Sequence, residues 1–582
     1  FQATQLLLQE RVPKASAFYV HASEVGAAQS GTLSAQMPIR VLNTPDTPIP
    51  EVQLLSNGRY HVMVTNAGGG YSRWHDLAVT RWREDGTRDP WGTFCYLRDV
   101  STEGQGGEPW SAAYQPTLRH GEGYEAIFSE GRAEFRRHDG DFDTHTEIVV
   151  SPEDDIELRR VRITNRSAVR RTLEVTSYAE VVLASAASDN LHPAFSNLFV
   201  QTEIIEAQRA ILCTRRPRSR DEAAPWMFHL MAVHDAHVDG VAYETDRERF
   251  IGRDRSTAAP RVMDAGAALS NSQGSVLDPV AAISGRIALE PDESVSVDLV
   301  YGIGDSRDSA LALVEKYQDQ RLADRVFELA WTHAQVVLRQ INATEADAQL
   351  YGRLANSIIF NNAALRADSS VLMGNRRGQS GLWGYAISGD LPIVLLRVGD
   401  LANIELVRQL IQAHAYWRLK GLVVDLVIWN EDRAGYRQVL QDQILGLVAV
   451  GLETKLMDRP GGIFVRSAEQ ISAEDRTLFQ TVARVILSDS RGTLAEQVNR
   501  PAAPRVRVPH LVPDRSLEEE AVVDAAAAQR DLILANGIGG FTPDGREYVI
   551  TTTPGQITPA PWVNVLANPQ FGSVISESGQ AY

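Results

Sequence analysis

The first half of the chain alternates apolar and polar residues in short runs, a pattern typical of β-strands. Between about residues 42 and 305, runs such as RYHVMVTN (59–66), IELRRVRITN (156–165) and SVSVDLVYGIG (294–304) are rich in β-branched and aromatic residues. Gly, Pro and Asp turns separate these runs, and no helical segment interleaves with them. The pattern therefore predicts a large antiparallel β-sandwich over residues 42–307.

After Asp305 the apolar residues recur at helical spacing. This spacing predicts a helical linker over 308–345 and paired helices over 346–500, with two short strands at 422–430 and 462–467. Paired helices after a β-sandwich suggest an α/α toroid. Twelve helices of about 11–12 residues with their loops need well over 200 residues, whereas about 155 are present. We therefore expect a reduced α/α toroid.

An internal repeat links the two ends of the chain. SNGRYHVMVTNAGGGY (56–71) aligns without gaps on ANPQFGSVISESGQAY (567–582). The repeat predicts that a second β-sandwich begins over 537–582, and we expect it to be cut off at the last residue. Residues 1–41 are predicted to be a linker from a preceding domain, and 501–536 a Pro-rich linker with a helix. The aligned pairs include Asn57 with Asn568, Tyr60 with Phe571, Gly68 with Gly579 and Tyr71 with Tyr582.

Composition narrows the classes of protein to which the chain can belong. A length of 582 residues exceeds what one hydrophobic core supports, so two or three domains are expected. The net charge of −17 comes without any basic run, which argues against nucleic acid as a partner. No run of about 18 apolar residues is present, so we expect no direct membrane insertion. The two cysteines and the histidines lack metal-ligand spacing, so no metal site is predicted.

Two stretches carry a family resemblance. TNAGGGYSRWHDLAVTRWRED (65–85) and GTFCYLRD (92–99) resemble the sandwich signature of carbohydrate phosphorylases of the cellobiose phosphorylase type. In that family a β-sandwich precedes a helical linker and an (α/α)6 barrel. FQATQLLLQERVPKA (1–15) and the residues from Asn536 onward resemble segments of the cyclic β-1,2-glucan synthases, which are large multidomain proteins. The resemblance implies an interior, phosphorylase-like region of such a synthase.

Cofactors, partners and location follow only from this resemblance. It implies a parent protein that uses UDP-glucose, with a divalent metal in its transferase domain and phosphate in its phosphorylase domain, and no cofactor in this region. The implied partners are β-1,2-glucan and other domains of the same polypeptide. The implied location is the cytoplasmic side of the bacterial inner membrane, as a soluble part of a membrane protein.

QSGLWGYAISGDLP (379–392) is the first candidate site. The family's cleft has Gln-Ser-Gly, then an aromatic residue and an Arg-Asp pair, all of which bind sugar hydroxyls. Gln379 is retained here, but apolar residues stand where Arg-Asp is expected. Trp383 and Tyr385 are candidates for stacking on a sugar, and Asp390 is a catalytic candidate. The alternative is a structural turn in which Asp390 caps a helix over PIVLLRV.

A second candidate site lies in WNEDRAGYRQVLQDQ (429–443). Glu431 and Asp432 follow a predicted strand, and glycoside hydrolysis uses paired carboxylates, one as acid and one as base or nucleophile. Arg437 and Asp442 match the Arg-x-x-x-Gln-Asp spacing of the family's cleft, so they are candidates for sugar binding. In the alternative interpretation, Asp432 caps the following helix and the other charges form its solvated face.

The third candidate site is GGGYSRWHD (68–76). In the family this sandwich loop reaches the mouth of the barrel, which makes Tyr71, Arg73 and Trp74 candidates for glucan contact. The alternative is a Gly-rich bulge whose aromatic residues turn into the core.

The sequence lacks the family's catalytic acid motif, and this absence favours a noncatalytic role. The family's general acid lies in an Asp-Asp-x-x-Trp-Leu-Pro stretch, which does not occur in this sequence, and its Gly-rich phosphate site is also missing. We therefore expect a noncatalytic region that positions catalytic modules and binds the growing glucan. Two alternatives stay open: an active phosphorylase or transglycosylase that acts on β-1,2-glucan, and a scaffold between domains without sugar affinity.

Overall fold

The structure of the protein is a computed structural model. It describes residues 39–582 except 102–106, 218, 220–223, 433–438, 451–455, 501–530 and 554. The described residues up to Arg500 belong to one compact unit, and residues 531–582 belong to another. The predicted linkers over 1–41 and 501–536 lie almost wholly outside the described residues.

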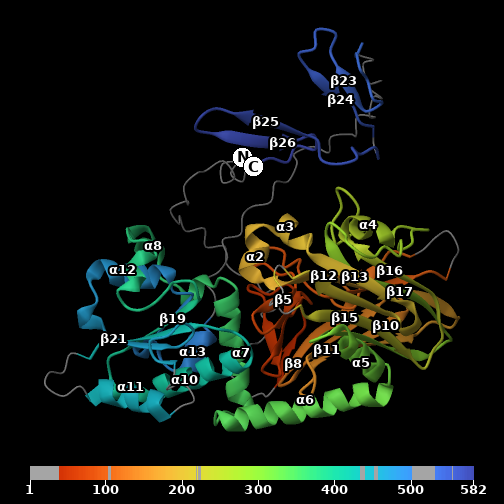
Figure 1. The fold of residues 1–582 in the computed structure, drawn as a ribbon. Coiled ribbons are helices and arrows are strands. Elements are labelled where there is room, and N and C mark those ends of the chain that lie inside the picture. The colour runs from red at the N-terminus through yellow and green to blue at the C-terminus, as the bar shows by residue number, and fades with distance from the viewer. Residues whose placement is uncertain are drawn as a thin grey trace, which may run out of the picture. The chain divides into compact units, whose positions relative to one another are not determined.

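Two nine-stranded antiparallel sheets form the sandwich (Figure 1). The prediction of a large antiparallel β-structure is confirmed. The first sheet is ordered β1 (Ile39–Leu42), β8 (Glu122–Ser129), β9 (Arg132–Asp139), β10 (Phe142–Val150), β11 (Ile156–Asn165), β18 (Ser294–Gly304), β15 (Trp226–His234), β14 (Ala210–Arg215) and β13 (Val200–Ile205). The second is ordered β16 (Val238–Asp246), β17 (Pro279–Leu289), β12 (Arg171–Ser185), β5 (Leu77–Thr80), β4 (Gly70–Trp74), β3 (Tyr60–Thr65) and β2 (Val52–Ser56), with β6 (Phe94–Asp99) and β7 (Trp110–Ser111) paired beside β12.

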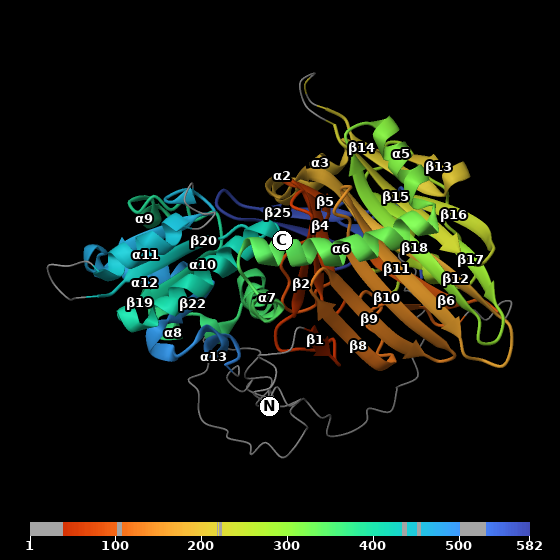
Figure 2. The ribbon, with the colours of Figure 1, turned by 90° about the horizontal axis from the view of Figure 1, so that it is seen from below.

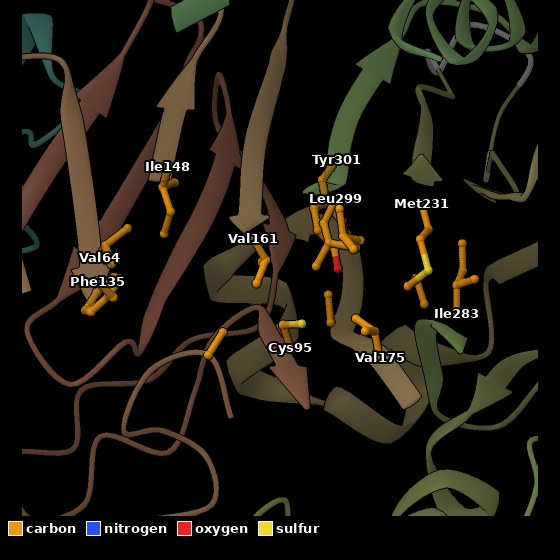
Figure 3. Close-up of a cluster of buried hydrophobic side chains, with 14 of the residues drawn as sticks. Val64, Cys95, Phe135, Ile148, Val161, Val175, Met231, Ile283, Leu299 and Tyr301 are labelled. Carbon is orange, nitrogen blue, oxygen red and sulfur yellow. The ribbon is translucent and has the colours of Figure 1, made fainter. Parts of the chain in front are cut away.

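Inward-facing side chains of both sheets form the sandwich core. Figure 3 shows part of this cluster, where Phe135 and Val161 of the first sheet lie in one core with Cys95, Val175 and Ile283 of the second. The alternation that was visible in the sequence arises because each strand turns one face toward this core. Short helices α2 (Ala186–Leu191), α3 (Pro193–Asn197) and α4 (Arg247–Ile251) lie in the connections between strands.

Asp89 is a buried carboxylic acid beside the Gly-rich loop of the sandwich. Its Oδ2 accepts a hydrogen bond of 2.5 Å from Thr65. Gly69 approaches so closely that a Cβ atom there would come within 2.7 Å of the same oxygen. Burial raises the pKa of Asp89 to about 7.

Two helices cover the outer face of the first sheet. α5 (Arg307–Tyr317) begins at a capping box formed by Ser306 and Ser309, and α6 (Gln320–Gln340) begins at Asp319, whose side chain caps it. Their apolar stripes pack on β11, β14 and β15 in a separate hydrophobic cluster. Figure 2 shows α6 crossing this face toward α7 (Glu345–Ile359).

The region over 346–500 contains a four-stranded parallel sheet, so the prediction of a reduced α/α toroid is wrong. Its strand order is β21 (Ile463–Ser467), β20 (Asp425–Asn430), β19 (Ile393–Val398) and β22 (Val485–Ser488). The other helices in this region are α8 (Ser369–Gly374), α9 (Ser380–Trp383), α10 (Ile404–Leu419), α11 (Val439–Val450), α12 (Ala473–Val482) and α13 (Leu494–Val498). This body is called the α/β body below.

Burial on both faces of the parallel strands explains the error. In β19, Val394 and Leu396 face the cluster that contains α7 and α10, whereas Ile393 and Leu395 face the cluster that contains α12. Such strands are continuous apolar runs without alternation and are easily taken for helices. The helix expected over PIVLLRV is therefore strand β19, while the strands predicted over 422–430 and 462–467 are confirmed as β20 and β21.

Buried polar contacts join the sandwich to the α/β body. Lys420, at the end of α10, lies 2.5 Å from Glu130 in the β8–β9 turn, and both side chains are buried. Tyr416 donates a second hydrogen bond to Glu130, at 3.1 Å. Arg40 of β1 donates to Gln349 of α7 at 2.8 Å. These contacts hold the two bodies in one unit.

Residues 531–582 form two small antiparallel hairpins. They are β23 (Gly539–Phe541) with β24 (Tyr548–Ile550), and β25 (Val563–Ala567) with β26 (Gly572–Ser576). A complete sandwich is not formed by the described part of this unit, and the second sandwich stays a prediction.

Replacement of Lys420 by Met is expected to lower the free energy of unfolding by roughly 3–5 kcal/mol, because it leaves the Glu130 carboxylate buried and unpaired. Urea denaturation followed by tryptophan fluorescence measures this change. The control is Arg408→Met, which removes an exposed guanidinium from an i,i+3 pair on α10 and is expected to change stability by less than about 1 kcal/mol. Equal effects of the two substitutions would contradict the assigned role of the buried pair.

The raised pKa of Asp89 predicts a specific pH dependence. The folded protein binds this proton more tightly than the unfolded chain, so the stabilising contribution is present below about pH 4 and is lost as the pH rises through about 7. The Asp89→Asn variant has no carboxyl group to ionise and does not lose this contribution. Its free energy of unfolding is expected to rise by on the order of 2–4 kcal/mol relative to that of the wild type between pH 4 and pH 8. Urea midpoints measured across this range test the prediction.

Asp85→Asn is the matched control for Asp89→Asn. Hydrogen bonds from Thr87 lower the pKa of Asp85, so its contribution is present at neutral pH and is lost as the pH falls through the folded-state pKa. The stability difference between Asp85→Asn and wild type should therefore stay nearly constant between pH 4 and pH 8 and change only as the pH falls below about 4. A flat difference for Asp89→Asn would contradict the prediction for Asp89.

Candidate functional site

The stretch 379–392 forms a compact turn before β19. The Gln379 side chain donates hydrogen bonds to the Ser388 carbonyl at 2.9 Å and to Asp390 Oδ1 at 3.1 Å. Trp383 Nε1 also donates to the Ser388 carbonyl, at 3.3 Å, while the residue as a whole is 63% exposed. Asp390 does not cap a helix, because a strand follows it. The turn thus holds an open indole ring beside an amide and a carboxylate.

Tyr385 belongs to the wall behind this turn. Its hydroxyl donates to Asp475 Oδ2 at 2.9 Å, and its ring meets Phe479 edge-on with centroids 5.2 Å apart. Burial and the hydrogen bond to Asp475 raise the pKa of Tyr385. Of the two aromatic candidates, Trp383 therefore presents the open face.

Glu431 and Asp432 lie directly after β20. Glu431 accepts hydrogen bonds of 2.8 Å and 3.3 Å from the Arg397 guanidinium of β19, so its charge is paired. The Asp432 amide donates to the Asn430 side chain at 2.9 Å. Asp442 is exposed in the first turn of α11. Arg437 lies outside the described residues, as does the predicted start of the following helix.

The first two candidate sites lie at opposite ends of the parallel strands, one before β19 and one after β20. Asp390 precedes β19, whereas Glu431 follows β20, and the register pairs Ile393 with Asp425 and Val398 with Asn430. A six-residue strand separates the two ends by at least about 16 Å. Glycoside hydrolysis requires carboxyl groups roughly 5–10 Å apart. Asp390 and Glu431 therefore do not form a catalytic pair.

Tyr71 of the third candidate site is part of the core, whereas Arg73 and Trp74 are half-buried. Tyr71 is buried and meets Trp82 edge-on with centroids 5.5 Å apart, and the Arg73 guanidinium lies 4.5 Å from the centre of the Tyr71 ring. Trp74 donates its indole N–H to Asp155 at 2.8 Å and packs against the sandwich core. Burial therefore withdraws Tyr71 from contact with a glucan, whereas glucan contact by the half-buried Arg73 and Trp74 stays a prediction.

A family comparison agrees with this architecture. The profile of the family described as glycosyl hydrolase 94, supersandwich domain, matches residues 35–320 and 546–582, just over half of the chain. The chain belongs to this family. The supersandwich match contains Tyr71, Arg73 and Trp74, whereas the α/β body with Trp383 and Glu431 lies outside it.

Several curated proteins are similar in sequence. Cyclic beta-(1,2)-glucan synthase NdvB of Rhizobium meliloti (strain 1021) is 33% identical over an alignment of 590 positions, which covers 100% of this chain and 21% of that protein. N,N'-diacetylchitobiose phosphorylase of Vibrio furnissii is 28% identical, with 49% of this chain and 35% of that protein covered. Solabiose phosphorylase of Paenibacillus borealis is 25% identical, with 47% and 35% covered. The chain thus spans between a fifth and about a third of these relatives.

One buried acid near the first candidate site was missed by the sequence analysis. Asp425 begins β20 and is fully buried, and its Oδ1 accepts a hydrogen bond of 2.7 Å from the Gly461 amide. Its Oδ2 has no hydrogen-bond partner among the described residues. Burial raises the pKa of Asp425, and the charge of Asp390 raises it further. The signal in the sequence is an acid inside the apolar run GLVVDLVIW (421–429).

A second group that sequence spacing did not reveal lies on the first sheet of the supersandwich. Glu134, His145 and Glu147 place three possible ligand atoms within 4.8 Å of one another. Arg132 lies in the same group, 2.6 Å from Glu147 and 3.2 Å from Glu134. Because this guanidinium already pairs with both carboxylates, the group carries no metal proposal.

Among the described residues, no helix is long and apolar enough to span a bilayer.

Proposed function

We propose that the chain is a noncatalytic, phosphorylase-like region of a cyclic β-1,2-glucan synthase, which positions catalytic modules and binds the glucan chain. The similarity to the glucan synthase of Rhizobium meliloti along the full length of this chain supports the parent, and the supersandwich match supports the phosphorylase-like fold. In this proposal the partners are β-1,2-glucan and other domains of the same polypeptide.

The observation that carries the noncatalytic part is the missing acid motif, because a phosphorylase needs only one acid, with phosphate as the nucleophile. The Asp-Asp-x-x-Trp-Leu-Pro stretch of the phosphorylases is absent from the sequence. The separation of the acids by the parallel sheet argues in addition against chemistry that uses two carboxylates. Asp390 and Glu431 lie at opposite ends of the strands, and Glu431 is paired with Arg397.

Rigid attachment of the two bodies supports the positioning role. The Glu130–Lys420 pair and the Arg40–Gln349 hydrogen bond are buried and link the supersandwich to helices α10 and α7. Buried contacts of this kind fix the orientation of one body relative to the other, whereas a flexible linker leaves that orientation free.

Trp383 supports the glucan-binding role. An exposed aromatic ring supplies a flat apolar face for a sugar ring, and the adjacent Gln379 and Asp390 carry groups that hydrogen-bond to hydroxyls. The hydrogen bond from Trp383 to Ser388 fixes the ring, which reduces the entropy lost on binding.

The remaining expectations are part of the same proposal and concern the parent protein. They are the use of UDP-glucose, the divalent metal of the transferase domain, the phosphate of the phosphorylase domain, and attachment to the cytoplasmic side of the bacterial inner membrane. No residue of this chain is assigned to them.

Trp383→Ala is expected to weaken binding of β-1,2-linked gluco-oligosaccharides at least about tenfold, because it removes the stacking face. Isothermal titration of the full chain measures the dissociation constant. The matched control is Trp331→Ala, which removes a comparably exposed indole from α6 and should leave binding unchanged. A flat isotherm for the wild type would leave only the scaffold role.

Incubation of the full chain with β-1,2-glucan and phosphate separates the proposal from the enzyme alternative. We expect no release of glucose 1-phosphate and no redistribution of chain length. Either activity, if it is lost in Asp390→Asn or Glu431→Gln, would overturn the noncatalytic assignment.

A further inference from the structure

A cavity of about 30 Å³ lies inside the sandwich, between its two sheets. Phe135, Ile148 and Val161 of the first sheet and Cys95 of the second form part of its wall, and Figure 3 shows these four side chains. A volume of about 10–15 Å³ is enough for one water molecule. The cavity therefore has room for one or two waters.

Two threonine hydroxyls in this wall have no hydrogen-bond partner among the described residues. They belong to Thr146 of β10 and to Thr93, which directly precedes β6. Both residues are more than nine-tenths buried. A hydroxyl that is buried without a partner loses the hydrogen bonds that it makes in water, and this loss destabilises the folded state.

The alternation of β10 places polar side chains at positions that face the sandwich core. Thr144, Thr146 and Ile148 are buried, whereas the residues between them are only partly buried. Ile148 belongs to the core cluster of the sandwich. Because side chains two apart in a strand share a face, both threonines point toward the same core.

A buried ion pair on β11 adds hydrogen-bond donors to the cavity wall. Arg159 Nη2 lies 2.9 Å from Glu157 Oε2, and both side chains are buried. Arg159 also lines the cavity, and its Nη1 donates to the Thr93 carbonyl at 3.1 Å. Of the five N–H groups of a guanidinium, three donate within the described part of the chain, which leaves two donors.

The ion pair also determines which charge a ligand of the cavity should have. Glu157 neutralises Arg159, so an anion in the cavity would be desolvated without a free positive charge to compensate it. A sugar or a nucleotide needs a far larger space, since pockets for small organic ligands have volumes of roughly 300–1,000 Å³. A small neutral molecule that both donates and accepts hydrogen bonds fits the cavity best.

We infer that this cavity is an internal hydration site, in which one or two ordered waters bridge the hydroxyls of Thr93 and Thr146 and solvate the Arg159 guanidinium. A buried water typically makes about three hydrogen bonds to polar groups that otherwise lack partners. Thr146 belongs to the first sheet and Thr93 leads into a strand of the second, so the water links the two sheets. The site is separate from the glucan contact proposed for Trp383.

Thr146→Val and Thr144→Val form a matched pair that tests the site in the full chain. Both hydroxyls are buried on the same strand without a partner among the described residues, but only Thr146 lines the cavity. Valine keeps the shape of threonine and removes the hydroxyl. Thr146→Val removes one partner of the bound water, so we expect calorimetry to show a Tm that is lower by about 2 °C.

Thr144→Val removes a hydroxyl that makes no hydrogen bond to the proposed water. It is expected to leave the Tm unchanged or to raise it, because an unpaired polar group is lost. Equal shifts for the two variants, or a higher Tm for Thr146→Val, would show that the Thr146 hydroxyl binds no water and would overturn the inference.

Crystals of the full chain soaked in sodium bromide identify the occupant directly. We expect a density peak within about 3.2 Å of both the Thr93 and the Thr146 hydroxyl oxygens, without anomalous scattering from bromide. In crystals of Thr146→Val this peak should weaken or shift toward Thr93. A cavity without density would overturn the hydration site, and a bromide peak would overturn the assignment of a neutral ligand.

Discussion

The sandwich and the α/β body both depend on one constraint, which is the burial of both faces of the β2–β3 hairpin. Leu55 and Val62 contribute to the sandwich core, while Leu54 and Met63, one position away on each strand, contribute to the core shared with α7. A shift of one residue would exchange the two sets of side chains. The register of one hairpin thus fixes the sandwich and the α/β body together.

Charged groups at the same boundary fix the relative orientation of the sandwich and the α/β body. The Arg40 guanidinium donates to Glu51 at 3.0 Å, to the Val52 carbonyl at 2.8 Å and to Gln349 at 2.8 Å, so its desolvation is offset by bonds to both bodies. Apolar burial alone tolerates many orientations, whereas these bonds have preferred directions. A buried ion pair adds little net stability, but loss of either partner is costly, and this asymmetry penalises any other arrangement of the two bodies.

How much the sequence predicted depends on how many faces of each strand are buried. The sandwich was predictable because its strands, such as β10, alternate between core and exterior. β19 was taken for a helix because its two faces meet different apolar clusters, which removes the alternation. Trp383 was predictable as an aromatic residue in a Gly-rich turn, whereas the burial of Tyr71 depends on Trp82 and on distant Phe360. Asp425 was visible only as an acid in an apolar run.

The parallel sheet also determines which of its edges is available to a ligand. In the order β21-β20-β19-β22, successive strands are added on one side of β19 up to β21 and on its other side for β22, so the strand order reverses between β19 and β22. Open α/β sheets bind ligands at the carboxyl ends of the strands at such a point. Here the Asp489 carboxylate, just after β22, accepts hydrogen bonds from the amides of Gly399 at 2.8 Å and Asp400 at 3.1 Å. The amides that would meet an anionic ligand at that point are therefore already bound within the protein. The open indole of Trp383 lies at the other ends of the strands, where the proposed sugar contact depends on an aromatic face rather than on backbone amides.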